Sequence, residues 1–278
     1  MTDGKVWLDT GLRDAAGPHI SIFDHGFTVG DGVFEAVKAV DGEPFALTRH
    51  LERLARSAVG LGLPPVDLLL VRRAVEATLA ANETLPLARI RITYTGGPAP
   101  LGSERGGHGP TLAVAVGPAK RHDPSTAVAT VPWTRNERGA LAGLKTTSYG
   151  ENALAVTRAH ESGASEAVFA DTVGRLSEGT GSNIFVVVGG RILTPTLGTG
   201  CLPGVTRALV LAWLPEVVEE DVPVEVLQHA DEVFLTSTLR DVQGVHRVDA
   251  RELAAPGPVT KDVMAIFAVR AAADPDPT

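Results

Sequence analysis

The stretch SEGTGSNIF, residues 177–185, places Glu178 beside a Gly-rich turn that leads directly into the apolar run IFVVV. A carboxylate that leaves water needs a partner, or it takes up a proton. Glu178 is therefore a candidate for binding a cationic group at the edge of a core.

Lys145, in AGLKTTSYGENALA, lies between apolar residues and a polar segment that starts a helix. The other lysines have simpler surface interpretations: Lys5 is near the terminus, Lys120 is in a polar linker, and Lys261 fits the exposed face of the last helix. Lys38 is predicted to point outward from a hairpin. A solvated role is the common one for lysine, but a desolvated amine at a strand–helix junction can act as a Schiff-base nucleophile.

Two segments have features that bind anions. In LPGVTRAL, 202–209, Val205 and Thr206 lie at a helix start, where free N–H groups and the helix dipole favour a phosphate; an ordinary helix cap is the alternative. FLTSTLRD, 234–241, ends a strand in hydroxyl residues, which also suits a plain turn. Arg53, in RHLERL, adds a cation, with a snorkelling arginine as the alternative.

One ligand matches all of these groups. It would offer a carbonyl to Lys145, a phosphate to Arg53, Val205, Thr206 and Thr238, and a basic ring nitrogen to Glu178. Pyridoxal 5′-phosphate carries all three. Under this hypothesis Glu178 pairs with the protonated pyridine nitrogen, which makes the ring an electron sink for the carbanion at the substrate's α carbon.

Composition sets broad limits on the protein class. The chain has 278 residues, 44% of them hydrophobic and 21% charged, so a sizeable core is available and no metal is needed to hold it. The net charge of −8 argues against nucleic acid and anionic membranes as main partners. Cys201 is the single cysteine, and no signal-peptide pattern is seen at the start, so a cytoplasmic location is expected.

The elements that must position these residues read as mixed α and β in two halves, 1–120 and 121–278, joined by a linker at 117–125. Thr48 is expected to cap a helix that continues through RHLERLARSAVG, and the ADPDPT tail is expected to be disordered. Hairpins are expected at Asp41-Gly42 and Gly189-Gly190. The other expected elements are strands at 5–9, 19–24, 88–95, 111–117, 126–133, 166–171, 233–237 and 245–249, and helices at 67–82, 149–163, from 203, and 259–272.

Six ordered blocks of the chain resemble the class IV aminotransferases, the fold-type IV pyridoxal phosphate enzymes. The blocks are FDHGFTVGDGVFEAV, HLERL, the Lys145 segment, EGTGSNIF, LPGVTR and DEVFLTST, with GPVTK near the end. The resemblance implies an α+β fold of two domains, a small N-terminal one (1–120) and a larger C-terminal one (121–278), with the cofactor between them. It also implies a homodimer in which the loop 96–110 lies near the partner's active site.

The resemblance carries residue roles with it. Lys145 and Glu178 are the implied catalytic residues. The implied cofactor-binding residues are Arg53, Lys145, Tyr149, Glu178, Asn183, Val205, Thr206, Ser237 and Thr238. The implied substrate-binding residues are Phe34, Glu35, Arg105 and Leu239. No metal is implied.

The leading activity is transamination between an amino acid and a 2-oxo acid, in which Lys145 forms the internal aldimine and moves the proton. Aminodeoxychorismate lyase, which gives 4-aminobenzoate and pyruvate, is the alternative, and Ala36, where many such lyases have Thr, weakens it. A non-catalytic cofactor-binding dimer is a third interpretation, which the presence of both Lys145 and Glu178 disfavours. Branched-chain enzymes usually have a tyrosine five residues after the lysine. Here that position is Gly150, and the tyrosine, Tyr149, lies one residue earlier. Substrate identity and handedness stay open.

Overall fold

The computed structural model describes residues 4–17 and 19–278. The chain forms two compact units, and the fold is α+β. Unit 1 contains the chain up to Lys120, together with two returning segments, Leu144–Tyr149 and Pro275–Thr278. Unit 2 contains Arg121–Gly143 and Gly150–Asp274. The segment that carries Lys145 therefore belongs to unit 1. A single domain boundary after residue 120 would assign it to the other unit.

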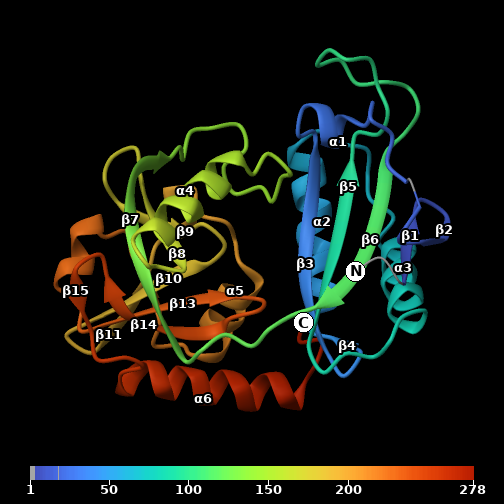
Figure 1. Ribbon diagram of the computed structural model, residues 1–278. Coiled ribbons are helices and arrows are strands. Elements are labelled where there is room, and N and C mark those ends of the chain that lie inside the picture. Colours follow the sequence, from blue (N-terminus) through green and yellow to red (C-terminus); the bar gives the residue numbers. More distant parts are fainter. Residues whose placement is uncertain (1–3, 18) are drawn as a thin grey trace. The chain divides into compact units, whose positions relative to one another are not determined.

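Unit 1 is an antiparallel sheet covered by helices on one face (Figure 1). Its strand order is β2-β1-β6-β5-β3-β4. Alternation along β3 and β5 turns Val33, Val37, Ile90 and Ile92 toward the helices, so the intervening residues lie on the opposite face. The elements are β1 Lys5–Leu8, β2 Gly11–Asp14, α1 His25–Thr28, β3 Gly32–Val40, β4 Glu43–Pro44, α2 Leu47–Gly60, α3 Leu68–Ala80, β5 Ala88–Thr95 and β6 Thr111–Pro118.

The helix α2 forms because Leu47, Leu51, Leu54 and Ala58 recur at helical spacing and all are buried. The expectation that Thr48 caps this helix was wrong. The residue that precedes the helix is Ala46, held at φ 53°, and it has no side-chain capping bond.

The cap of α2 comes from the far end of the chain. The Asp276 carboxylate accepts from the Thr48 N–H at 2.8 Å and from its hydroxyl at 2.7 Å. The Ala46 N–H donates to the Pro275 carbonyl at 2.7 Å. The predicted disorder of the tail was therefore wrong, because its polar groups satisfy an otherwise uncapped helix start.

Two other expectations in unit 1 failed. Residues 19–24 do not form a strand, because the buried Asp24 caps α1 through the Gly26 N–H and accepts from the hydroxyls of Thr95 and Thr111. Lys38, expected to point outward into solvent, is buried: it is 7% exposed, and its Nζ lies 4.7 Å from the centroid of the Phe45 ring. The Asp41-Gly42 hairpin is confirmed, with positive φ at both residues.

Unit 2 is built on a mixed sheet ordered β12-β11-β10-β13-β14-β7-β8-β9 (Figure 1), with β15 on β14. Because β9 also pairs with β10, the strands from β10 to β9 close on themselves around an apolar core. The elements are β7 Ser125–Arg135, α4 Gly150–Glu161, β8 Glu166–Asp171, β9 Leu176–Gly179, β10 Asn183–Val188, β11 Arg191–Thr194, α5 Val205–Trp213, β12 Val218–Glu219, β13 Glu232–Ser237, β14 Asp241–Val248, β15 Arg251–Glu252 and α6 Pro258–Ala273, with short 3₁₀ turns at Leu197–Thr199 and Val224–Gln228.

The Gly189-Gly190 hairpin is confirmed, since both glycines have positive φ. Within residues 4–17 and 19–278, no helix has the length and apolar character needed to cross a membrane.

Candidate active site

Lys145 is held against the start of β3 by its own backbone. Its carbonyl accepts from the Phe34 N–H at 2.9 Å, and its N–H donates to the Ser57 hydroxyl at 3.2 Å. The side chain is half-buried, and its Nζ lies 4.5 Å from the Phe34 ring centroid and 6.0 Å from that of Tyr149. The amine is thus fixed beside an aromatic pair rather than in open solvent.

Phe34 and Tyr149 form an edge-to-face pair with centroids 5.4 Å apart and an interplanar angle of 82°. The structure therefore places Tyr149 at the lysine despite its shifted position in the sequence. Both predicted residues lie with Lys145 in unit 1.

Arg91 joins this cluster, and the sequence reasoning missed it. Its guanidinium carbon lies 3.4 Å from the Phe34 centroid, and its Nε donates to Thr93 at 3.2 Å. Within the described part of the chain no carboxylate pairs with it. Partial desolvation lowers the pKa of Arg91 to about 10, so it stays charged at neutral pH. The alternation in ARIRITYT, which sets Arg91 opposite Ile90 and Ile92, was the signal available in the sequence.

Glu35 lies on the opposite face of β3 from Phe34, in a fully buried cluster with two residues of α2. Arg53 donates to its two oxygens at 2.8 and 2.7 Å, and His50 Nδ1 lies 2.7 Å from Oε2. Burial raises the pKa of Glu35, but the adjacent Arg53 and His50 outweigh burial and hold it below its usual range. Burial lowers the pKa of His50.

The exposed fractions of these side chains bear on the two interpretations of Arg53, a cation for a phosphate or a surface arginine that snorkels. The Arg53 side chain is 5% exposed and that of Glu35 is 0%. A surface arginine that snorkels is thereby excluded, and Glu35 has both oxygens engaged inside the protein.

The guanidinium of Arg105 is hydrogen-bonded to other residues of unit 1. It makes two bonds to Asp31, at 2.7 and 2.6 Å, and donates to the carbonyls of Leu61 and Gly62. These contacts hold the loop 96–110 against the turn before β3 and against the residues that follow α2. The hydrogen bond to Asp31 raises the pKa of Arg105.

Glu178 lies in unit 2, 8% exposed, at the end of β9. Its Oε2 accepts from the Leu202 N–H at 2.9 Å, and its Oε1 lies 3.1 Å from Arg135 Nε. Arg135 is itself stacked 4.3 Å from the centroid of Phe169. The sequence reasoning did not identify Arg135 as the neighbour of Glu178, because it reaches the acid from a strand more than 40 residues away.

The remaining predicted residues of unit 2 gather around Glu178 and the start of α5. Asn183 pairs with Glu178 across β9 and β10, and its amide donates to the Leu202 carbonyl at 2.8 Å. A Cβ at Gly204 would lie 1.9 Å from the Asn183 side-chain oxygen, so a larger residue there would displace that amide. Three half-buried residues, Ser237, Thr238 and Leu239, occur at the end of β13, whose Thr236 pairs with Asn183.

The helix α5 begins with N–H groups that no side chain caps. Val205 and Thr206 are its first two residues and both are buried. An uncapped start on a nine-residue helix provides the backbone donors and the positive end of a dipole that a phosphate requires.

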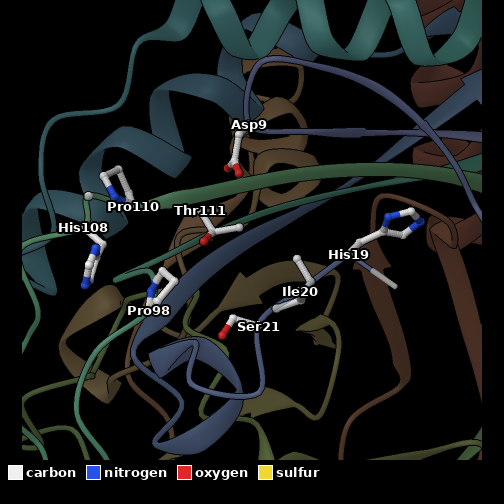
Figure 2. A pocket seen from close by; sticks show the side chains of 9 residues that line it. Asp9, His19, Ile20, Ser21, Pro98, His108, Pro110 and Thr111 are labelled. Atoms are coloured by element: carbon white, nitrogen blue, oxygen red, sulfur yellow. The ribbon is translucent and has the colours of Figure 1, made fainter. Parts of the chain in front are cut away.

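A separate pocket of about 300 Å³ lies in unit 1 beside the loop 96–110 (Figure 2). Asp9, Ser21, His108 and Thr111 contribute to its walls. It contains none of the residues assigned to the cofactor or the substrate. In the figure the His19 ring points away from the other polar side chains.

Comparison with known proteins places these residues in a family. The family model for Amino-transferase class IV matches residues 32–248. A putative branched-chain-amino-acid aminotransferase from Methanocaldococcus jannaschii is 35% identical over 260 residues, 89% of this chain and 88% of that protein. A D-alanine aminotransferase from Bacillus licheniformis is 29% identical over 93% of this chain and 94% of that protein.

The solved structures agree with this assignment. The branched-chain aminotransferase of Thermoproteus uzoniensis, solved with norvaline, superposes with a TM-score of 0.90 at 29% identity, covering 95% of this chain and 93% of that one. The chain belongs to the class IV aminotransferases, enzymes that move an amino group between an amino acid and a 2-oxo acid.

Proposed function

We propose that this chain binds pyridoxal 5′-phosphate, the cofactor of its family, and that Lys145 is the residue bonded to it. The observation that carries the proposal is the placement of Lys145 Nζ beside Phe34 and Tyr149, with Arg91 on the same ring. Lys38, whose side chain is buried, stacks on Phe45 instead. When bound, pyridoxal phosphate draws electron density away from the substrate's α carbon.

The residues of unit 2 fit two other parts of that molecule. The uncapped start of α5 suits its phosphate, with Thr206 and Thr238 as further donors. The Glu178 carboxylate suits its pyridine nitrogen. The Leu202 N–H and Arg135 fix the position of that carboxylate, so its geometry is set before any ligand arrives.

We assign the proton transfer to the Lys145 amine, which would take the proton from the substrate's α carbon and deliver it to C4′ of the cofactor, the carbon on the other side of the transferred nitrogen. The Phe34 and Tyr149 rings lie beside this amine and would hold it in one position for the step. Glu178 would hold a proton on the pyridine nitrogen of the bound cofactor. Arg53, tied to Glu35, contributes a cation for the phosphate.

Arg91 is the proposed binding residue for the substrate carboxylate. It is cationic, has no carboxylate partner in the described chain, and lies on the same aromatic ring as Lys145. Arg105, expected from the sequence to do this, is engaged by Asp31 and two carbonyls. Arg240 and Arg135 are engaged as well, by Glu166 and Glu178.

The test is a half-reaction with single amino acids of both hands and no acceptor. We expect at least one to bleach the yellow enzyme, and a 2-oxo acid to restore the colour. Arg91→Ala should raise KM for that amino acid by about tenfold or more, for loss of a charged hydrogen bond of ~1.5–3 kcal/mol. If no amino acid bleaches the enzyme while aminodeoxychorismate yields 4-aminobenzoate and pyruvate, the lyase function replaces this one.

We also propose a homodimer, with a second copy covering an apolar surface of unit 1. Ile22, Phe23, Phe27 and Val29 are exposed along one segment, with Phe27 at 75%. The loop that carries Leu101, 74% exposed, is bonded to this segment through the Ala99 N–H and the Phe23 carbonyl. Light scattering should give the mass of a dimer, and Phe27→Asp should give a monomer.

The cytoplasmic location stays a prediction.

A further inference from the structure

Unit 2 contains a buried ion pair to which no role has yet been assigned. Arg240 Nη2 lies 2.8 Å from Glu166 Oε2, and the two side chains are 9% and 4% exposed. Taking two charges out of water is costly, so a buried pair of this kind is weak evidence for stability. The other hydrogen bonds of Glu166 and Arg240 therefore say more about the role of the pair than the ion pair does.

Glu166 holds the turn that follows Glu178. Its second oxygen, Oε1, accepts from the Gly181 N–H at 2.7 Å and from the Thr180 hydroxyl. A Cβ on Gly179 would lie 3.1 Å from the Glu166 side chain, so the turn is packed directly on this carboxylate. A shift of Glu166 would therefore move this turn, and with it the residues on either side, Glu178 and Asn183.

Arg240 holds the end of β13. It follows Thr238 by two residues, and its backbone N–H donates to the Ser237 hydroxyl at 3.4 Å. Its guanidinium also donates to Gln243 on β14, which fixes the fork toward Glu166. These contacts leave the Arg240 guanidinium facing inward.

We propose that the Glu166–Arg240 pair is a positioning link that joins the Glu178 turn to the Thr238 strand end. The inference rests on the proposed function, in which Glu178 meets the pyridine nitrogen and Thr238 the phosphate. Neither Glu166 nor Arg240 touches the cofactor in this account. Both contacts to the cofactor then depend on one buried ion pair, and loss of Arg240 loosens them together.

The test compares Arg240→Gln with Arg251→Gln. Arg251 also lies in unit 2 and donates to the Leu227 and Ala230 carbonyls, but it is bonded to neither segment of the link. Pyridoxal phosphate affinity is measured by titration of the apoprotein, and apoprotein melting is recorded in parallel. We expect Arg240→Gln to weaken binding at least about fivefold, the scale of coupling within one network, while Arg251→Gln binds as the wild type does, whatever its melting temperature.

Two further variants keep the test decisive. Arg240→Lys retains the charge but not the fork, and should weaken binding less than Arg240→Gln. The double variant Glu166→Gln with Arg240→Gln removes both charges, and its loss of affinity should be smaller than the product of the two single losses. If Arg240→Gln does not fold, Arg240→Lys supplies the comparison with Arg251→Gln.

A spectroscopic readout separates positioning from general damage. With pyridoxal phosphate labelled with ¹⁵N in the ring, the wild type should show a protonated nitrogen, and Arg240→Gln a partly deprotonated one. Unchanged affinity and an unchanged ¹⁵N shift in the Arg240 variants would overturn the link. Failure of the wild type to bind the cofactor, or its attachment to a lysine other than Lys145, would overturn the proposed function instead.

Discussion

Replacing Glu35 by Gln should destabilise unit 1 without altering substrate recognition. The carboxylate is 0% exposed, and it accepts bonds at 2.7 to 2.8 Å from both Arg53 and His50. An amide in its place has one oxygen and one NH₂, so an N–H group must face a donor, and the buried guanidinium of Arg53 loses its counter-charge. Removal of one member of a buried ion pair costs about 3–5 kcal/mol.

For a chain of this size that free-energy loss corresponds to a fall in melting temperature of roughly 6–20 °C. Glu52→Gln is the matched control, because it makes the same substitution on the exposed face of the same helix and should change stability by less than about 0.5 kcal/mol. Scanning calorimetry gives both values. Steady-state kinetics of Glu35→Gln below its melting temperature should give the wild-type KM for the amino acid. A melting temperature equal to that of Glu52→Gln, or a KM raised several-fold, would show that Glu35 faces the substrate and that this reasoning is wrong.

Three other outcomes follow from the contacts. Glu178→Gln removes the charge that holds the ring proton and should lower turnover roughly 100-fold or more, with a smaller effect on cofactor affinity; unchanged turnover would remove its assigned role. Asp276→Asn weakens the remote cap of α2 and should cost about 1 kcal/mol in thermal stability, whereas an unaltered melting curve would mean that the tail contributes nothing. Because the folded pKa of His50 is below its ordinary value of 6.5, the unfolded chain binds more protons on acidification, so stability should fall as the pH drops below 6.5 and, through Glu35, again below 4.5. Stability that is flat from pH 7 to 5 would contradict the burial of a neutral His50.

Local patterns were sufficient for much of the fold. The Gly189-Gly190 hairpin and the strand at 88–95 are where periodicity and turn residues predicted them, because those signals act over a few residues. The tail and the cap of α2 were missed for the opposite reason. Thr48 and Asp276 are 228 positions apart, and nothing near either one shows that they meet.

The candidate site divides in the same way. Motifs found Lys145 and Glu178, but charge partners came from distant segments: Arg135 for Glu178, Asp31 for Arg105, and Glu35 for Arg53. Arg91 could have been found, since strand alternation sets it on the face of Phe34.

Lys38 shows the limit of alternation. It does lie on the face of the sheet away from the helices, yet it is buried, because the parity of a strand fixes a direction and not an exposure.

Borohydride reduction of the protein loaded with pyridoxal phosphate tests the central claim most directly. The reduction fixes the cofactor to the lysine that holds it, and peptide mass spectrometry then identifies that lysine. We expect the added mass on the peptide that contains Lys145 and on no other, with Lys145→Ala giving none. An adduct on Lys38, or no adduct on a protein that binds the cofactor, would contradict the account.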